Sequence, residues 1–295
     1  MSAQFDNILL IVNPSSRNGA SDEIERGVDR LQQAGINVIE VESQSIEKSC
    51  EAIFVYYKKV DLVVLAGGDG TISSVAKCLY ETKSPFAILP LGTANDLARS
   101  LDLPASIDSA FNAILHGKLK QIDLGWVNGH YFFNVANIGL GVDITYELTP
   151  EVKKYWGVFS YLKALFSALV RAKRFRVKVK VDGKEYKLRS MHLGVGNGRY
   201  YGGGNVIDED CLIDNGLLSI YSLKPQTVWD LLVHAPLLRY GQHKSNPRTF
   251  IRRGKRIEVL TQGSKEIHAD GEFVSHTPAT FKVIPKALSV VVPAQ

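Results

Sequence analysis

Residues 63–72 read VVLAGGDGTI. An apolar run of the kind that forms a buried strand ends in two glycines, an aspartate and a third glycine, and a helix-like pattern follows. A strand, a glycine turn and a helix N-terminus in this order place backbone N–H groups around a phosphate. A glycine turn alone is a weak signal, so an ordinary tight turn between strand and helix remains the alternative.

A second stretch, residues 89–99, repeats this arrangement with the sequence LPLGTANDLAR. Thr93 and Asn95 offer short hydrogen-bonding side chains at the turn, and Asn95 or Asp96 is expected to cap the helix that follows. If the two strands are neighbours in a parallel sheet, both turns line one crevice at the carboxyl ends of the strands. The two stretches together therefore predict a nucleotide-binding crevice.

These motifs carry a resemblance to a known family. GGDGT at 67–71 and PLGTANDLAR at 90–99 are accompanied by Asn13-Pro14 near the N-terminus and by Asp270-Gly271-Glu272 near the C-terminus. In this order the four motifs resemble the diacylglycerol kinase and sphingosine kinase catalytic-domain family, close to its bacterial lipid kinase branch. The resemblance spans nearly the whole chain. It implies an enzyme that uses ATP and Mg²⁺ to phosphorylate a lipid hydroxyl.

Composition limits the class of protein and its partners. A chain of 295 residues is long enough for two domains. The formal net charge of +5 suits an anionic nucleotide or an anionic membrane surface, and nothing points to nucleic acid. Three widely separated cysteines, with no CxxC pair, argue for a reducing compartment and against a disulfide framework or a zinc cluster.

The chain shows no signal peptide, and no apolar run approaches the roughly 20 residues that span a bilayer. We therefore expect a cytoplasmic protein that associates transiently with the membrane surface, where its lipid substrate lies. The sequence does not indicate an oligomeric state.

Alternating strands and helices occupy the first part of the chain. We expect strands at residues 8–12, 37–41 and 86–89, in addition to the strand that precedes GGDG. One helix is expected to begin at Ser21, and three more to cover residues 47–59, 72–82 and 96–101. This order predicts a doubly wound, mostly parallel sheet, so residues 1–123 form a Rossmann-like α/β domain.

From residue 124 onward the pattern changes to short strands and glycine or asparagine turns. Residues 175–181, FRVKVKV, alternate strictly between apolar and basic, and Asp182-Gly183 then predicts a hairpin turn. Residues 124–295 are therefore expected to form an antiparallel β-sandwich, as the resemblance also implies. The final strand at 288–292 could return to the first domain.

Two apolar segments, 155–171 and 225–240, interrupt the expected strands. Both have helical patterns. The first is aromatic-rich and leads into basic residues, so it either packs across the sandwich or lies at a membrane interface.

The motifs supply candidates for each part of a phosphoryl transfer. Asp69 is expected to organise metal and water around the phosphates, and Asp270 is the first candidate for the general base, with Glu272 as the second. The residues expected to bind the nucleotide are Asn13, Gly67, Gly68, Asp69, Gly70, Thr71, Ile72, Ser73, Thr93 and Asn95.

Residues 212–217 resemble a loop that holds a structural magnesium in bacterial relatives through one carboxylate and backbone carbonyls. In those relatives an aspartate directly precedes the glycine, whereas here Asn215 holds that position after Asp214. An asparagine is a weaker ligand for a hard cation, so the site could shift to Asp214, bind more weakly, or be empty. The candidate ligands are Leu212, Asp214, Asn215 and Leu217.

Two other functions stay open at this point. NAD kinases share GGDG and a two-domain plan, although the PLGTANDLAR and DGE motifs favour the lipid branch. A nucleotide-binding regulator that has lost catalysis is the third alternative, because the magnesium loop departs from the family pattern at Asn215.

Overall fold

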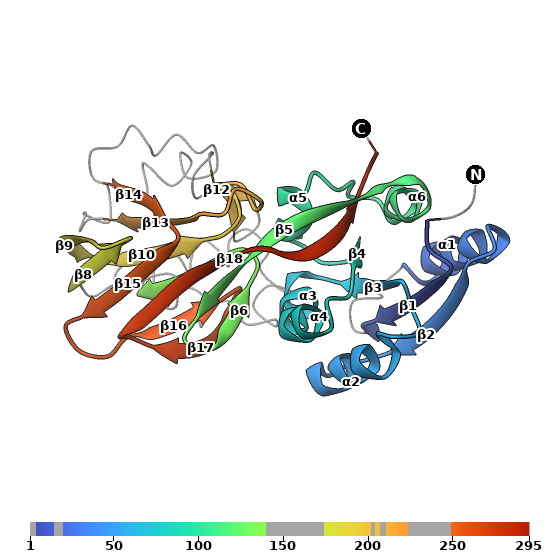
Figure 1. Cartoon of the computed structure of the whole chain (residues 1–295), viewed down its shortest axis with the longest axis horizontal. Helices are drawn as coiled ribbons and strands as arrows, with labels where there is room; N and C mark the ends of the chain where they lie inside the picture. The colour runs from blue at the N-terminus through green and yellow to red at the C-terminus, as the bar shows by residue number, and fades with distance from the viewer. Residues whose placement is uncertain are drawn as a thin grey trace, which may run out of the picture.

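The computed structural model describes residues 4–14, 20–139, 174–201, 204–206, 211–223 and 249–294. Predicted helices at 155–171 and 225–240 lie outside these residues. Figure 1 shows an elongated molecule in which helices and a twisted sheet at one end meet a second group of strands at the other.

The first part is a parallel sheet in the order β2-β1-β3-β4 (Figure 1). Its strands are β1 (Asn7–Val12), β2 (Asn37–Glu42), β3 (Leu62–Gly67) and β4 (Phe86–Pro90). Helices are α1 (Ser21–Gln33), α2 (Ile46–Tyr56), α3 (Asp69–Ser74), α4 (Ala76–Thr82), α5 (Asp96–Ser100) and α6 (Ile107–His116).

Helices cover both faces of this sheet, because its strand residues are apolar on both sides. In β3, Val63 and Leu65 belong to the core with α2 and α4, whereas Leu62 and Val64 belong to the core with α1 and α6. Successive side chains of a strand point to opposite faces, so an unbroken apolar run requires two covering layers. The predicted doubly wound α/β class is confirmed.

Two helices differ from the sequence expectation. Helix α6 was not predicted, although Ser106 is its N-cap and accepts a hydrogen bond from the Ser109 N–H at 3.2 Å. The helix expected at 72–82 is divided at Val75, where φ is −101° and ψ is 5°, and its first part starts three residues earlier, at Asp69.

The second part contains two sheets that face each other. Strands β14-β13-β10-β7-β16-β17 form an antiparallel sheet, and β15, β8 and β9 extend the first sheet. Apolar residues from both enclose a shared core that includes Val179, Val195 and Phe281. The predicted β-sandwich is confirmed. The strands that follow β4 along the chain are β5 (Lys118–Val127), β6 (His130–Phe132), β7 (Val135–Gly139), β8 (Phe175–Val181), β9 (Lys184–Ser190), β10 (His192–Gly196), β11 (Tyr200–Tyr201), β12 (Asn205–Val206), β13 (Leu218–Leu223), β14 (Thr249–Gly254), β15 (Arg256–Thr261), β16 (Glu266–Ala269), β17 (Glu272–His276) and β18 (Ala279–Val292), of which β11 and β12 form a small sheet of their own.

Strand β18 connects the two parts (Figure 1). β5 pairs with β18 from Phe281 to Val292, while β15 pairs with the first residues of β18 on its other side and β4 pairs with it at Val290, opposite Phe86. One continuous sheet therefore runs through the whole molecule, while the domain limits 1–123 and 124–295 remain a prediction.

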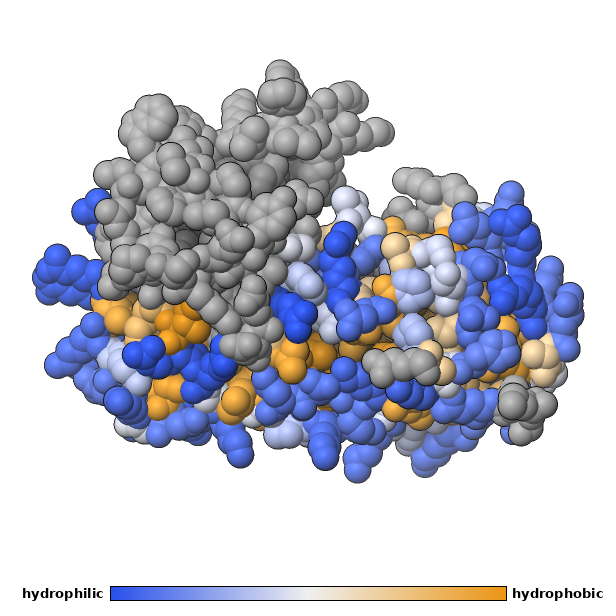
Figure 2. Space-filling view, turned by 90° about the horizontal axis from the view of Figure 1, so that it is seen from above, coloured by the Kyte–Doolittle hydropathy of each residue, from blue (hydrophilic) through white to orange (hydrophobic). Residues whose placement is uncertain are grey.

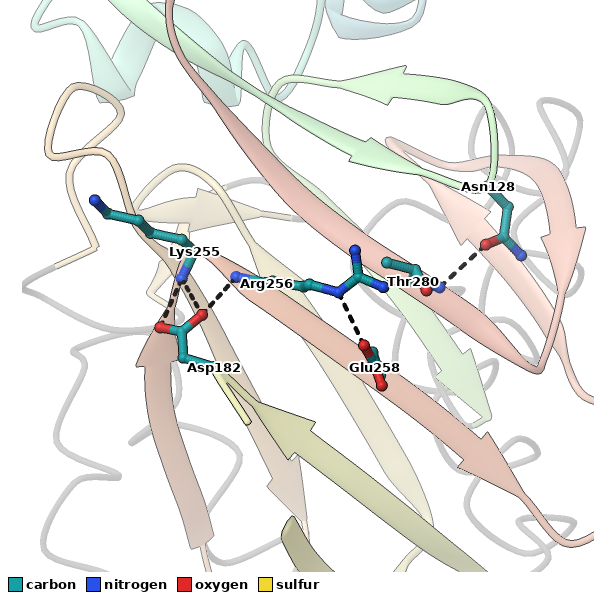
Figure 3. Close-up of polar contacts among 6 residues, drawn as sticks. All are labelled: Asn128, Asp182, Lys255, Arg256, Glu258 and Thr280. Atoms are coloured by element: carbon teal, nitrogen blue, oxygen red, sulfur yellow. Dashed lines mark hydrogen bonds and ion pairs between the residues drawn. The ribbon is translucent and has the colours of Figure 1, made fainter. Parts of the chain in front are cut away.

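The tight turns of the sandwich are tied to neighbouring strands (Figure 3). Asp182 and Gly183 have φ of 44° and 90°, the left-handed pair that a two-residue hairpin turn requires. The Asp182 carboxylate accepts hydrogen bonds from the backbone N–H groups of Lys255 at 3.0 Å and Arg256 at 2.8 Å. At a second turn, Asn128 Oδ1 accepts from the Thr280 N–H at 3.1 Å. These contacts fix the sandwich edge.

The cysteines differ from the expectation. Cys50 on α2 and Cys78 on α4 form a disulfide, with their Cα atoms 5.7 Å apart, while the buried thiol of Cys211 donates to the Gly196 carbonyl at 3.5 Å. The two helices pack on the same face of the sheet, so cysteines separated by 28 residues come within bonding distance. The expectation of unpaired cysteines is therefore wrong for this pair.

Hydrophilic residues cover most of the described surface in Figure 2, and apolar residues emerge between them in small groups. None of the helices within the described residues is long and apolar enough to cross a membrane.

Candidate active site

The two glycine turns lie side by side at the carboxyl ends of β3 and β4. Gly67 is paired with Pro90 in the sheet, and beyond them Gly68 and Gly92 pack backbone against backbone. A Cβ atom on Gly92 would lie 2.6 Å from the Cα of Gly68, closer than real Cβ contacts. Glycine is therefore required there for the loops to meet.

Asp69 joins the two turns through its carboxylate. Its oxygens accept hydrogen bonds from the backbone N–H groups of Asp96 and Leu97, each at 3.1 Å, in the first turn of α5. Asp69 thus caps this helix from the neighbouring loop. Asn95 holds the N-cap position of α5, as expected, but its side chain makes no capping bond and instead binds the Gly92 N–H at 3.0 Å and carbonyl at 2.8 Å.

Asn13 and Thr71 also meet at this edge. The Asn13 side-chain amide donates to Thr71 Oγ1 at 3.2 Å, and the Asn13 N–H donates to the carbonyl of Ala66 at 3.1 Å. The structure therefore brings the Asn13-Pro14 motif onto the GGDGT turn. Ile72 is buried beneath this turn, whereas Gly70 and Thr93 are exposed at the rims of the two loops.

The most connected side chain at the site is Asp270, in the turn between β16 and β17. Its φ is 47°, and the carboxylate faces both parts of the molecule. One oxygen accepts from Ser73 Oγ at 2.8 Å and from the Phe133 N–H at 2.7 Å. The other accepts from the N–H groups of Asn134 at 2.9 Å and Val135 at 3.0 Å. Asp270 therefore links α3 of the first part to the β6–β7 segment of the second.

Burial raises the pKa of the Asp270 carboxyl above its usual value, although all four hydrogen bonds act in the opposite direction. A carboxyl with a raised pKa accepts a proton more readily near neutral pH. Glu272, two residues on, is exposed at the start of β17. This geometry favours Asp270 over Glu272 as the proton acceptor.

Two further buried carboxylates, Asp96 and Asp123, are not among the residues that the sequence predicts to bind or react. Asp96 is 5% exposed and accepts from the Gly204 N–H at 2.8 Å. Asp123 is 1% exposed and accepts from the N–H groups of Gly216 at 2.6 Å and Lys286 at 2.8 Å. Asp123 is a single acidic residue between apolar residues of β5, a pattern that could have predicted a buried, hydrogen-bonded carboxylate. From the sequence it is predicted only to mark the end of the first domain.

The residues of the candidate magnesium loop form contacts with one another and with Lys120. Asp214 Oδ2 forms an ion pair with Lys120 Nζ at 2.9 Å, and Asn215 Oδ1 accepts from the Leu217 N–H at 3.0 Å. The carbonyl of Leu212 accepts from the Asn215 N–H at 3.4 Å. Across the described ranges, no group of three or more histidine, cysteine or acidic residues could hold a metal. Asp214 is thus paired with an ammonium in this arrangement, and magnesium binding by this loop stays a prediction.

Most of the chain matches two known protein families. Residues 7–127 match the family described as diacylglycerol kinase catalytic domain, and residues 136–292 match the YegS C-terminal NAD kinase beta sandwich-like domain. A diacylglycerol kinase of Staphylococcus aureus (strain MRSA252) is 25% identical over 288 residues, covering 96% of this chain and 91% of the relative.

Solved structures give the same result. A Bacillus anthracis protein described as a proposed diacylglycerol kinase is 26% identical, with a TM-score of 0.85, over 99% of this chain and 96% of that one. A second Bacillus anthracis diacylglycerol kinase, 24% identical with a TM-score of 0.77 over 98% and 97%, shares the fold.

The fold and the paired motifs define the class of two-domain kinases that join a glycine-turn domain to a β-sandwich. Within this class, the chain belongs to the family of proteins that combine a diacylglycerol kinase catalytic domain with a YegS-type C-terminal domain. The family resemblance read from the sequence is confirmed.

The Lys120 contact generates a prediction. The melting temperature of the wild-type protein should not change with Mg²⁺ or with EDTA, because the Lys120 ammonium already neutralises Asp214. Lys120→Met should free this carboxylate, so that Mg²⁺ binds the folded state and raises the melting temperature. Lys118→Met, an exposed lysine on the same strand, is the matched control and should stay insensitive to Mg²⁺.

Thermal denaturation followed by circular dichroism measures the effect without nucleotide. A rise in the wild-type melting temperature with Mg²⁺ that Asp214→Asn removes would show that the loop binds metal despite Lys120.

Proposed function

We propose that the protein is an ATP-dependent lipid kinase that transfers the γ-phosphate of ATP to a hydroxyl of a diacylglycerol-, phosphatidylglycerol- or sphingoid-like lipid. One observation carries the proposal. The Asp270 carboxylate from the sandwich is hydrogen-bonded to Ser73 on the helix that starts within GGDGT. A candidate base is thus held beside the candidate phosphate loop, as phosphoryl transfer to an alcohol requires.

The two glycine turns would hold the ATP phosphates. Backbone N–H groups of the Gly67–Ser73 segment, together with the side chains of Asn13, Thr71 and Thr93, are the proposed contacts, and Asn95 holds the second turn in shape. Asp69 keeps the two turns at a fixed separation through its bonds to α5. Mg²⁺ bound with the nucleotide would neutralise negative charge on the phosphates.

Asp270 would take the proton of the lipid hydroxyl. Three of its four donors are backbone N–H groups held by β6 and β7, whereas the Ser73 hydroxyl is on a side chain that can rotate. The acceptor hydroxyl would replace Ser73 at Oδ2 of Asp270 and donate its proton there as the phosphoryl group arrives.

A kinase assay with labelled ATP, Mg²⁺ and mixed-lipid micelles tests the function. The wild-type protein should phosphorylate at least one lipid. Asp270→Asn should lower kcat by about 10²–10⁴-fold, the usual contribution of a general base, with little change in the Kd for ATP. Glu272→Gln is the control and should keep near-normal kcat. An unchanged kcat for Asp270→Asn would exclude it as the base.

An NAD kinase activity is the second candidate, favoured by the likeness of residues 136–292 to an NAD kinase-type sandwich. NADP formed from NAD and ATP, with no lipid phosphorylated, would replace the lipid proposal. ATP binding without any product would instead favour a non-catalytic regulator.

The raised pKa of Asp270 generates a prediction about pH. If its ionised form is the base, kcat/KM, which reports the free enzyme in which Ser73 is still bonded to Asp270, falls as the pH drops through the raised pKa. Ser73 donates a hydrogen bond that lowers this pKa, so Ser73→Ala should raise it further and move the acid limb of the pH–rate profile to higher pH.

Ser74→Ala is the matched control, because Ser74 donates to the Thr71 carbonyl and should leave the acid limb in place. An acid limb that does not move in Ser73→Ala would separate the pH dependence from Asp270.

A lipid kinase must bind a membrane surface, and one face of the sheet carries an excess of basic residues. Outward-facing positions of β8, β9, β15 and β18 share this face through the strand register. The Glu258 carboxylate there is already paired with Arg256, at 2.8 Å (Figure 3). The face carries two acidic residues, Glu185 and Glu258, and a larger number of basic residues, namely Arg176, Lys178, Lys180, Lys187, Arg189, Arg256 and Lys282.

We call these nine residues the basic face. Its surplus of positive charge complements an anionic lipid surface, which attracts exposed Lys and Arg by about 1 kcal/mol each. Lys178→Glu combined with Arg189→Glu should therefore weaken binding to phosphatidylglycerol vesicles, and added salt should weaken wild-type binding.

Vesicle sedimentation measures this binding. Lys58→Glu with Lys59→Glu makes the same change in net charge beyond the end of α2, and should bind as the wild type does. Equal loss in both double variants would mean that overall charge, and not the basic face, controls binding.

A further inference from the structure

One half of the basic face is balanced by its own acids. In the strand register, Lys180 of β8 lies between Glu185 of β9 and Glu258 of β15. The Glu258 carboxylate also accepts a hydrogen bond from Arg256 at 2.8 Å. Opposite charges on neighbouring strands stabilise a sheet, so this half of the face needs no external ion.

The other half carries four cations in register and no acid. Arg176 lies directly opposite Arg189, and Lys178 lies directly opposite Lys187. All four side chains are exposed on the outer side of the sheet, because the residues between them in β8 and β9 pack into the sandwich core. Within the described part of the chain, none of the four is paired with an acid. Like charges directly opposite each other destabilise a sheet, so this half lacks the negative charge that would offset its repulsion.

These four cations surround a shallow depression of about 450 Å³, which Leu260 and Gln262 also line. Leu260 lies opposite Lys178 in the register, and its side chain is 51% exposed. An exposed leucine beside clustered cations offers apolar contact together with positive charge, which suits an anionic group attached to an apolar chain. We call the four cations and Leu260 the cation pocket.

The cation pocket is separate from the candidate active site. Strand β9 is the last strand of its sheet, and Figure 1 shows β8 and β9 at the sandwich end of the molecule, away from α3 and α5. A ligand in the pocket would therefore leave the crevice between the glycine turns open.

We propose that the cation pocket is a second lipid site, which binds the phosphomonoester headgroup of a membrane lipid. A phosphomonoester carries about 1.5 to 2 negative charges near neutral pH and presents three acceptor oxygens, whereas the phosphodiester of phosphatidylglycerol carries a single charge. Four clustered cations match the more highly charged group. Two of them are arginines, whose planar guanidinium groups bind phosphate oxygens through paired N–H donors.

The choice of lipid rests on the proposed lipid kinase function, because a lipid phosphomonoester is the class of product that such a kinase forms. Product bound in the pocket would hold the enzyme on a membrane where it has already acted. The basic face as a whole attracts any anionic surface, whereas the pocket distinguishes one anionic headgroup from another.

Vesicle sedimentation without nucleotide tests the pocket. Phosphatidylcholine vesicles contain either phosphatidic acid or phosphatidylglycerol, in amounts that give the same measured surface potential. The wild-type protein should bind the phosphatidic acid vesicles about tenfold more tightly. Arg176→Gln combined with Lys187→Gln removes one cation from each opposite pair, and should bring this ratio close to one.

Lys180→Gln combined with Arg256→Gln is the matched control, because it removes the same charge from the balanced half of the same face. It should weaken binding to both kinds of vesicle and keep the wild-type ratio. A wild-type ratio close to one, or an equal loss of the ratio in both double variants, would overturn the proposal and leave only the general charge of the basic face.

Other outcomes assign the headgroup to a different place or source. If Arg176→Gln with Lys187→Gln keeps the ratio, the headgroup binds outside the pocket and the proposal fails. Glycerol 3-phosphate that binds as tightly as the vesicle lipid, measured by calorimetry, would show that the pocket takes a soluble phosphate compound and would overturn the lipid assignment.

Because ATP is absent, none of these results depends on kinase activity. A protein that phosphorylates no lipid, yet prefers phosphatidic acid through the pocket, would refute the proposed function and support the second lipid site.

Discussion

The four hydrogen bonds to the Asp270 carboxylate are the contacts on which the rest of the site depends. They join a serine on the helix after the glycine turn to three consecutive backbone N–H groups of the sandwich. Because these groups come from distant parts of the chain, the carboxylate fixes the position of the sandwich turn relative to the phosphate loop. Burial still raises the pKa of Asp270, which keeps it suited to accept a proton.

A second constraint holds the phosphate side together. The backbone contact between Gly68 and Gly92 brings two turns within reach of each other, and Asp69 then bonds to the first turn of α5. Asp69 was expected to act on metal and water. Its observed contacts are with backbone N–H groups, so its contribution to catalysis would include the shape of the crevice that receives the nucleotide.

Some charged side chains on this molecule are paired with a neighbour, and others are gathered on one exposed face. Lys120 balances Asp214 in the loop where a cation was anticipated, and the basic face carries its excess on exposed strand positions. Neutral acceptors, by contrast, collect beside Asp270, where Asn134 Oδ1 has no partner within the described chain.

The alternation of strands and helices in the first part, the glycine turns and the change from a doubly wound sheet to a sandwich could be predicted from the amino-acid sequence. Those features depend on local patterns, namely apolar runs, period-two alternation and residues that permit tight turns. The nucleotide candidates from Asn13 to Asn95 could be gathered at one edge for the same reason, since parallel strands end together. Helix α6 was not predicted, although Ser106 is a residue type that commonly caps a helix N-terminus.

The partners of these residues follow from the way the chain packs in three dimensions. Asp69 bonds to N–H groups 27 and 28 residues away, Asp270 to a serine 197 residues away, and Cys50 to Cys78 across two helices. The Lys120–Asp214 pair and the unsatisfied oxygen of Asn134 belong to the same group. Such contacts depend on how separate sheets and helices pack, and packing joins positions whose separation along the chain carries no local signal.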